Sequence, residues 1–355
     1  MKEAQPVGPE NPTGASRPGA PAPTSPSPTS WKASTLNWSG ALAAAALIVV
    51  PLWMLLSNPA VPGGHPALPT LVVAAAAGGI LWALILVRRW NPTKGRNLRD
   101  QQRSRGISTW QLVRGIAGTL AVLGFVAALM WLSPFPHQPD RETTVPATAT
   151  APATSSTAED TTSITLAPAG TATTGLVFYP GARVDAHAYQ DLLRPLADAG
   201  HLVVILKAPL GVSLLDPNQA RATMDRHPEI VSWAVGGHSL GGVSASSFAA
   251  SNHDVAGLLL FASYPAETMT DAQGLSVLSI SGSNDGLSTP DKIAASRSLL
   301  PPTTTYATVV GGVHAFFGDY GEQPGDGDAG ISRDEAQRQI VAESLRFMDR
   351  LKASG

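Results

Sequence analysis

The chain has 355 residues, and 24 lysines and arginines face 26 aspartates and glutamates, which gives a formal net charge of −2. This balance provides no overall electrostatic attraction to nucleic acid, and we expect no nucleic-acid partner. The chain contains no cysteine, which excludes a disulfide framework, a thiolate nucleophile and a cysteine-ligated metal.

Residues 1–37 are rich in Pro, Ser, Thr, Gly and Ala and contain few large apolar side chains. A segment of this composition buries too little apolar surface to offset the entropy lost on folding. We therefore expect residues 1–37 to form a disordered N-terminal tail.

Three long apolar segments come next, at residues 38–56, 71–87 and 115–132. Each approaches the roughly 20 residues that a helix needs to cross the hydrocarbon core of a bilayer. Buried helices of a globular core are the alternative, but these nearly charge-free segments precede any globular pattern. Pro51 lies in the first segment, where a membrane helix tolerates it. The sequence thus predicts a membrane region over residues 38–132 with three transmembrane helices.

The connection between the second and third segments is strongly basic. It carries Arg88, Arg89, Lys94, Arg96, Arg99, Arg103 and Arg105 against the single acid Asp100, whereas residues 57–70 contain no Lys or Arg. The positive-inside rule therefore places the N-terminus and the basic connection in the cytoplasm. Everything after Leu132 then lies on the extracytoplasmic side of the cell membrane. Nucleic-acid binding is the alternative function of the basic connection, but a topology signal is the commoner one.

Residues 133–173 are dominated by Thr, Ala, Pro and Ser. Because such a segment cannot form a core and its prolines favour extended backbone, we expect a stalk that separates the membrane region from residues 174–355.

Residues 174–355 are enough for one hydrophobic core, and short apolar runs alternate there with helical patterns. The predicted strands are residues 176–179, 202–206, 230–235, 256–261, 275–281 and 304–310. The predicted helices are residues 185–199, 214–226, 240–251, 289–299 and 332–352. This alternation predicts an α/β fold with a mostly parallel sheet of roughly six strands, covered on both faces. Catalytic groups should then gather at the carboxyl ends of the strands.

Residues 237–241 read Gly-His-Ser-Leu-Gly, which matches the G-x-S-x-G nucleophile elbow. A predicted strand precedes this motif and a helix of small residues comes after it. In that setting the motif holds its serine at a sharp turn, with the hydroxyl exposed above the sheet. A glycine-rich turn with an incidental serine is the alternative, and the strand–turn–helix context favours a nucleophile at Ser239.

Two further catalytic candidates lie directly after predicted strands. Asp285 comes after residues 275–281, and His314 comes after residues 304–310. The chain order Ser239, Asp285, His314 is the order of the triad in α/β-hydrolases. His314 can remove the proton of Ser239 near neutral pH, and Asp285 can hold the imidazole and stabilise its charged form. The backbone N–H groups of Leu240 and Ala182 are the candidate oxyanion donors.

Four motifs together resemble the α/β-hydrolase superfamily, and within it small bacterial alpha/beta hydrolase family proteins related to dienelactone hydrolases. They are Tyr-Pro-Gly-Ala-Arg-Val-Asp at 179–185, Lys-Ala-Pro-Leu-Gly at 207–211, Gly-Gly-His-Ser-Leu-Gly-Gly at 236–242, and a Gly-Val-His segment at 312–321. The resemblance extends from about residue 175 to residue 355, and it implies a serine hydrolase with Ser239, Asp285 and His314 as the triad. Dienelactone hydrolases use a cysteine nucleophile, so their substrate is not implied for this cysteine-free chain.

Other polar residues have competing interpretations. Glu267 comes after the strand 256–261, where some α/β-hydrolases carry their catalytic acid. We interpret His238 as a packing residue, and His187 and His201 as surface or packing residues. Lys207 either lines the pocket or is solvated.

Asp319 and Tyr320 either support the His314 loop or bind substrate. No spacing of His, Asp and Glu indicates a metal, and we expect no cofactor.

The sequence therefore predicts a membrane-anchored serine hydrolase that cleaves carboxylic esters through an acyl-enzyme. The short connections leave no room for a large cap, so we expect an open site for a small-molecule or lipid-like ester. A cell-envelope acyltransferase or a peptidase would use the same groups. A non-catalytic, membrane-tethered binding or sensing module is the alternative from another class, and a triad in the correct order argues against it.

Overall fold

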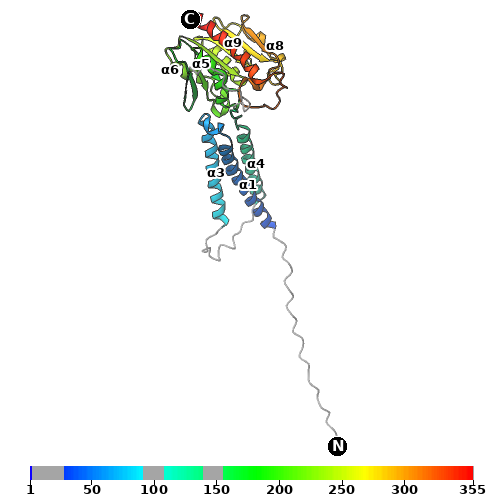
Figure 1. Ribbon diagram of the computed structural model, residues 1–355. Coiled ribbons are helices and arrows are strands. Elements are labelled where there is room, and N and C mark those ends of the chain that lie inside the picture. The colour runs from blue at the N-terminus through cyan, green and yellow to red at the C-terminus, as the bar shows by residue number, and fades with distance from the viewer. Residues whose placement is uncertain (2–27, 91–107, 139–154, 355) are drawn as a thin grey trace.

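The computed structural model describes residue 1 and residues 28–90, 108–138 and 155–354. An α/β domain stands on one end of a bundle of long helices (Figure 1). Most of the predicted N-terminal tail, the basic connection beyond residue 90 and the middle of the predicted stalk (139–154) lie outside the described residues.

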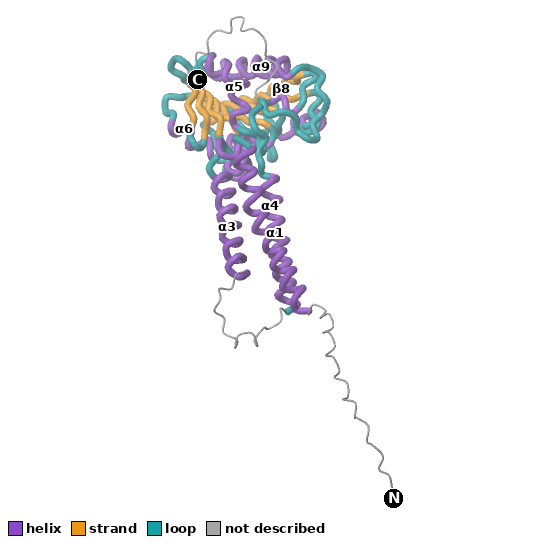
Figure 2. Tube along the Cα trace, turned by 60° about the horizontal axis from the view of Figure 1, so that its bottom comes forward, coloured by secondary structure: helices purple, strands orange, loops and turns teal. Residues whose placement is uncertain are grey.

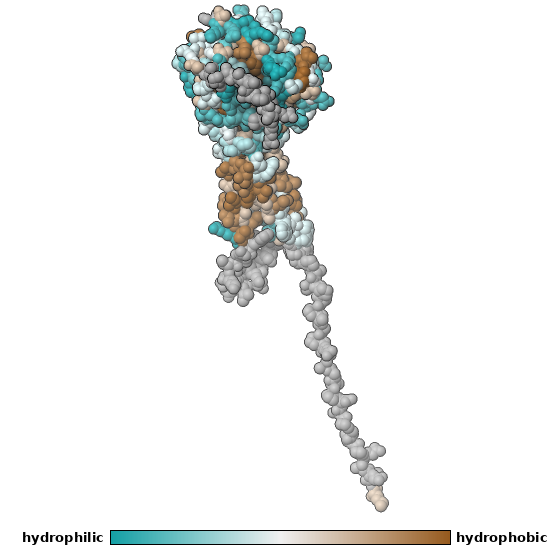
Figure 3. All heavy atoms as spheres, viewed as in Figure 1, coloured by the Kyte–Doolittle hydropathy of each residue, from teal (hydrophilic) through white to brown (hydrophobic). Residues whose placement is uncertain are grey.

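The bundle consists of α1 (Pro28–Ser57), α3 (Ala67–Trp90) and α4 (Thr109–Trp131), with the short α2 (Ala60–Gly63) between the first two. These three long helices have the length and apolar composition needed to cross a membrane. Their contacts are formed by a small apolar cluster that includes Met54, Val72 and Leu129. Most other apolar side chains of the bundle face outward, which gives the brown band of Figure 3. The arrangement is compatible with membrane anchoring.

The helices of the bundle are longer than predicted. α1 begins at Pro28, ten residues before the predicted span, so the prediction of a disordered tail is wrong for residues 28–37. The apolar run nucleates a helix that continues through the more polar turns before it. α4 begins at Thr109 because Ser108 and Gln111 form a reciprocal capping box. The sequence Ser-Thr-Trp-Gln carries that signal.

The domain contains a sheet of eight strands in the order β1-β2-β4-β3-β5-β6-β7-β8. Neighbouring strands from β4 to β8 in this order run parallel, whereas β1 and β2 form an antiparallel edge. The strands are β1 (Ser156–Glu159), β2 (Ser163–Ala167), β3 (Thr174–Tyr179), β4 (Leu202–Leu206), β5 (Ser232–His238), β6 (Val255–Phe261), β7 (Ser276–Gly282) and β8 (Thr305–Val309). The predicted α/β fold with a mostly parallel sheet is confirmed, with two more strands than the six expected.

The two additional strands correct the prediction of a stalk over residues 133–173. β2 pairs with β4, and its Ile164 and Leu166 are fully buried. A strand this short, with only two large apolar side chains, is hidden when composition is averaged over a Thr- and Ala-rich segment. Phe135, at the start of the same predicted stalk, forms a β-bridge with Val184 of the domain.

Helices cover both faces of the sheet (Figure 2). α5 (Gln190–Asp198) and α9 (Arg333–Ser354) pack together on one face, and α6 (Gln219–Arg226) and α7 (Leu240–Ser251) cover the other. β3 contributes side chains to the apolar cores on both faces of the sheet. Leu176 and Phe178 pack in one core, and Val177 and Tyr179 pack in the other. The remaining helices are α8 (Pro290–Ser296), η2 (Ala186–Tyr189), η3 (Pro209–Gly211), η4 (Ser213–Leu215), η5 (Arg297–Leu299) and η6 (His314–Phe317).

The carboxyl ends of the parallel strands lie toward the helix bundle. η3, the helix after β4, contacts α3, and its Leu210 packs against the apolar cluster of the bundle. The β-bridge between Phe135 and Val184 joins the segment after α4 to the loop after β3. The edge of the sheet where the predicted catalytic residues gather therefore faces the three apolar helices.

Candidate active site

Ser239 lies at a strained turn between β5 and α7. Its φ of 52° and ψ of −124° are uncommon for a residue with a side chain. The Ser239 N–H donates to the Phe261 carbonyl at 3.0 Å, and the Ser263 hydroxyl donates to the Ser239 carbonyl at 2.6 Å. These two bonds hold the backbone of the turn against β6 and the loop after it.

The glycines on either side of this turn are required by close backbone contacts. A Cβ on Gly237 would overlap the backbone of Gly241, and a Cβ on Gly241 would overlap the carbonyl oxygen of Tyr179. The turn therefore brings α7 against the ends of both β5 and β3. This is the strand–turn–helix geometry that exposes a nucleophile above a parallel sheet.

Asp285 and His314 form a buried pair at the ends of neighbouring strands. The His314 Nδ1–H donates to Asp285 Oδ2 at 2.8 Å, and the two side chains are 1% and 0% exposed. Asp285 Oδ1 accepts the N–H groups of Leu287 at 2.8 Å and Ser288 at 2.7 Å. With its carboxylate held by three donors, Asp285 fixes the ring orientation of His314 and leaves Nε2 as the basic nitrogen.

The Nε2 atom of His314 is buried and has no hydrogen-bond partner among the described residues. The Ser239 hydroxyl therefore makes no hydrogen bond to it in this structure. Contacts between a nucleophile and its base are often long without substrate and shorten when it binds. The site thus holds an oriented base whose reactive nitrogen is not used by any structural interaction in the described part of the chain.

The two candidate oxyanion donors come from adjacent strands. Ala182 lies in the loop after β3, and Leu240 is the first residue of α7, directly after Ser239. β3 and β5 pair in the sheet, with Tyr179 opposite Gly237, which sets the two loops side by side. In the part of the chain that the structure describes, no hydrogen bond uses either N–H. Both donors are therefore free for a ligand.

A buried network that the sequence did not reveal joins the loop after β3, which carries Ala182, to the turn at Ser239. The Tyr189 hydroxyl accepts the Gly181 N–H at 2.9 Å and lies 2.9 Å from Nδ1 of His238. Burial raises the pKa of the Tyr189 hydroxyl, so it stays protonated and donates to that nitrogen. His238, directly before Ser239, is thereby linked to Gly181, directly before Ala182.

His238 also packs against the candidate base. The rings of His238 and His314 lie 4.5 Å apart, and the ring of Phe317 stacks on His238 at 6.0 Å. Burial, together with the nearby His314, lowers the pKa of His238 well below its usual value of 6.5. His238 is therefore neutral at physiological pH, and His314 can take a proton without a second cation beside it.

Asp326 joins the loops that carry Asp285 and His314, and it was not identified from the sequence. Its carboxylate accepts the N–H groups of His314 at 3.0 Å, Ala315 at 2.8 Å and Gly286 at 3.2 Å. Gly286 is the residue directly after Asp285, so one carboxylate fixes the backbone of both loops. The only sequence signal is an acidic residue between two glycines, and this pattern is too common to predict a role in the site.

The other basic candidates have structural partners. The Lys207 ammonium is 2.6 Å from Glu159 and is 5% exposed. The His187 ring lies between the carboxylates of Asp185 and Glu159. The buried His201 ring contacts the Thr174 hydroxyl on one side and the Asp349 carboxylate on the other.

Asp319 and Tyr320 meet side chains of neighbouring segments. Asp319 accepts a hydrogen bond from Gln337, and the Tyr320 hydroxyl donates to Gln323. Glu267 is exposed, and among the described residues the carboxylate that holds the His314 ring is that of Asp285. Within the same residues, no group of three or more His, Asp or Glu side chains could hold a metal.

Comparison with known proteins relates the domain to a family. Residues 175–339 match the model of the alpha/beta hydrolase family, and the α/β fold agrees with that match. The chain is similar to the solved dienelactone hydrolase-like promiscuous phosphotriesterase P91 from metagenomic libraries, with 19% identity and a TM-score of 0.41. A structure described as m3DLH shows 17% identity and a TM-score of 0.42. Each alignment covers 53% of this chain and 92% of the other. None of the curated proteins matches the sequence. The C-terminal domain is thus related to the α/β-hydrolase superfamily.

Replacing Asp326 should loosen the loops that carry Asp285 and His314. The Asp326→Ala variant loses four charge-assisted acceptor contacts, the fourth from the Gly327 N–H, which should cost about 2 kcal/mol and lower the midpoint of thermal unfolding by roughly 5 °C. The measurement is thermal unfolding of the purified full-length protein in detergent. The exposed Asp328 is the control, since its side chain makes no hydrogen bond in the described part and Asp328→Ala should leave the midpoint unchanged. Equal midpoints for both variants would contradict the assigned role.

The depressed pKa of His238 predicts a loss of stability in mild acid. The unfolded chain protonates this side chain below about pH 6.5, whereas the folded protein resists protonation, so its contribution is present above that pH and lost as the pH falls. The His238→Asn variant keeps an acceptor for Tyr189 and should show a shallower fall in unfolding midpoint from about pH 6.5 to 5. Some slope should remain, because burial also lowers the pKa of His201. An unchanged slope would contradict the assignment.

Proposed function

We propose that this protein is a membrane-anchored serine hydrolase that cleaves carboxylic esters through Ser239, His314 and Asp285. The observation that carries the proposal is the buried His314–Asp285 pair, at 2.8 Å, on the same edge of the sheet as the strained Ser239 turn. The relation of the domain to the α/β-hydrolase superfamily supports hydrolase activity in general. The serine chemistry and the choice of esters rest on the geometry of these residues.

In this mechanism the Ser239 oxygen attacks the ester carbonyl while His314 Nε2 takes its proton. The negative charge that develops on the carbonyl oxygen is stabilised by the N–H groups of Leu240 and Ala182. Asp285 stabilises the imidazolium, and its two backbone donors hold the carboxylate in place through the reaction. The imidazolium then protonates the leaving alcohol. In the second half of the reaction, His314 takes a proton from the attacking water and returns one to Ser239 as the acyl-enzyme is cleaved.

The environment of His314 favours this proton transfer. Its Nδ1–H is committed to Asp285, its backbone N–H is held by Asp326, and its Nε2 has no structural partner among the described residues. The neutral His238 beside it avoids repulsion of the imidazolium. Together these contacts leave Nε2 as the nitrogen of His314 that can accept a proton, as general-base catalysis requires.

We further propose that the three apolar helices span the cell membrane and that the domain lies on its extracytoplasmic side. The length and composition of the helices support the spans. The basic connection between α3 and α4 supports the orientation, because positive loops stay in the cytoplasm.

A fluorophosphonate probe tests the nucleophile. The probe should label the wild-type protein, and Ser239→Ala should abolish labelling because the probe reacts with an activated serine hydroxyl. Ser298, an exposed serine on η5, provides the control Ser298→Ala, whose labelling should equal that of the wild type. Labelling of a folded Ser239→Ala protein would contradict the proposal, and the absence of labelling in the wild type would favour a non-catalytic module. Product analysis with a competing alcohol separates hydrolysis from acyl transfer.

A single introduced cysteine tests the orientation, because the natural chain has none. Gln273 is exposed on the domain, and Gln273→Cys should react with a membrane-impermeant maleimide on intact cells. The control is the same variant in permeabilised cells, which should be labelled to the same extent. Labelling only after permeabilisation would place the domain in the cytoplasm.

A further inference from the structure

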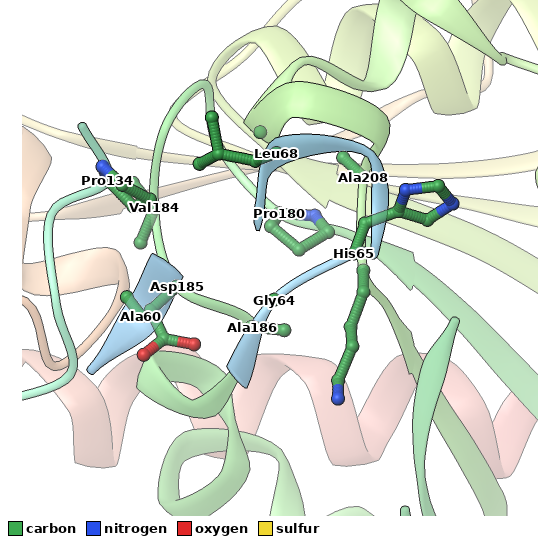
Figure 4. A pocket seen from close by; sticks show the side chains of 12 residues that line it. Ala60, Gly64, His65, Leu68, Pro134, Pro180, Val184, Asp185, Ala186 and Ala208 are labelled. Atoms are coloured by element: carbon green, nitrogen blue, oxygen red, sulfur yellow. The ribbon is translucent and has the colours of Figure 1, made fainter. Parts of the chain in front are cut away.

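The catalytic edge of the domain rests on the helix bundle. Figure 4 shows a small cavity, with room for about 30 Å³, where the two meet. Ala60, Gly64 and Leu68 of the bundle side face Pro180, Val184 and Ala208 of the loops after β3 and β4. The loop that carries the candidate oxyanion donor Ala182 is therefore part of the surface that meets the bundle.

Arg183, the neighbour of Ala182, binds the end of α4 directly. Its guanidinium lies over the ring of Trp131 at 4.9 Å and over the ring of Phe135 at 5.0 Å. It also donates to the Ser133 carbonyl at 3.2 Å, and the Phe135 N–H donates to the Arg183 carbonyl. α4 and the loop after β3, which carries Ala182, are thus fixed relative to each other.

The tryptophans of α4 indicate the level of the bilayer. Trp110 and Trp131 are exposed near the two ends of the helix, and they are separated by about 31 Å along its axis. That separation equals the thickness of the hydrocarbon core, and tryptophan concentrates at its two boundaries. Trp131 therefore marks the boundary on the domain side. Through Arg183, Ala182 lies within roughly 15 Å of that boundary.

Exposed leucines project from the same edge of the sheet. Leu214 and Leu215 of η4 are 45% and 59% exposed, and they come directly after η3, whose Leu210 packs against the bundle. The other two large apolar side chains exposed on the domain, among its described residues, are Val231 and Val310. Adjacent exposed leucines beside an apolar bundle are suited to contact with lipid.

A mostly apolar groove extends from Leu214 along α7. It has a volume of about 210 Å³, and its apolar lining comes from Leu214, Val243, Ala250, Pro265, Ala266 and Met269, with three serines of α7 and Glu267 as the polar part. Val243 lies one helical turn after Ser239, so the groove begins close to the nucleophile. Six of its ten lining residues are apolar, which suits a hydrocarbon chain better than a polar substrate.

We propose that the ester cleaved at Ser239 is that of a membrane lipid, whose acyl chain passes from the bilayer over Leu214 and Leu215 into this groove. The proposal rests on the serine-hydrolase function above and specifies its substrate class. A bond forms between Ser239 Oγ and the acyl carbon, the ester C–O bond breaks, and the lipid alcohol leaves with the proton from His314. Water then releases the fatty acid and restores Ser239.

A lipid-quenching experiment tests the contact with the bilayer. The full-length chain, with Leu215→Cys as its single cysteine, carries an environment-sensitive fluorophore and is reconstituted in phosphatidylcholine vesicles. Phosphatidylcholine spin-labelled near the head group should quench this fluorophore strongly. Val231 provides the control Val231→Cys. It is 72% exposed and lies directly before β5, at the amino ends of the parallel strands. Equal quenching at both positions would overturn the proposal.

An activity ratio tests the groove. Vesicles with the full-length protein receive either p-nitrophenyl acetate, which needs no groove, or a fluorogenic diacylglycerol in the bilayer. Ala250→Trp fills the groove from an exposed position and should lower the ratio of diacylglycerol to acetate hydrolysis about tenfold, as lost burial of two methylenes would. Ala295→Trp, equally exposed on α8, should leave the ratio unchanged.

The outcomes separate the two proposals. Ser239-dependent hydrolysis of the acetate with no hydrolysis of the diacylglycerol overturns the lipid substrate and leaves the serine hydrolase standing. An unchanged ratio in Ala250→Trp also overturns the lipid groove. Inactivity on both esters, together with no fluorophosphonate labelling of Ser239, overturns the serine hydrolase itself and the lipid substrate with it.

Discussion

The close approach of α7 to the ends of β3 and β5 is the constraint on which the site depends. Gly237 and Gly241 allow backbone to meet backbone there, and any side chain at either position would force the turn apart. That contact holds Ser239 at its positive φ and aligns the Leu240 N–H beside the loop of Ala182. The hydrogen bonds from Gly181 through Tyr189 to His238 then keep the loop and the turn in register.

The segment after α4 extends this constraint to the bundle. Residues 133–138 bond to Arg183 and Asp185 in the loop after β3, and the Gln138 N–H donates to the carbonyl of Asp319, just beyond the His314 loop. Two loops of the candidate site thus share one short connection with the last apolar helix. A shift of α4 would be transmitted to the backbone around Ala182, because Arg183 combines a strained backbone with a side chain fixed on Trp131.

The sequence was sufficient to predict the position of a residue where a general rule of the fold determines that position. The meeting of Asp285 and His314 could be predicted because parallel strands end at one edge, and both residues come after strands whose apolar runs are distinct. β1 and β2 were missed because an edge strand needs few buried side chains, and Ile164 and Leu166 lie in a Thr- and Ala-rich background. Asp326 and Tyr189 were missed for a different reason. Tyr189 joins Gly181, eight residues away, to His238, 49 residues away, and Asp326 joins Gly286, 40 residues away, to His314, so no single sequence motif contains these contacts.

The proposed placement of the site near the bilayer boundary would have an energetic consequence for a lipid substrate. Each methylene drawn from hydrocarbon into water costs about 0.8 kcal/mol, so complete extraction of a long acyl chain would cost on the order of 10 kcal/mol. A carbonyl that needs to rise only roughly 15 Å leaves the distal part of its chain in the bilayer. The groove beside Val243 and Met269 then buries much of the part that has left. Proximity and an apolar path together remove most of the barrier that a distant soluble domain would face.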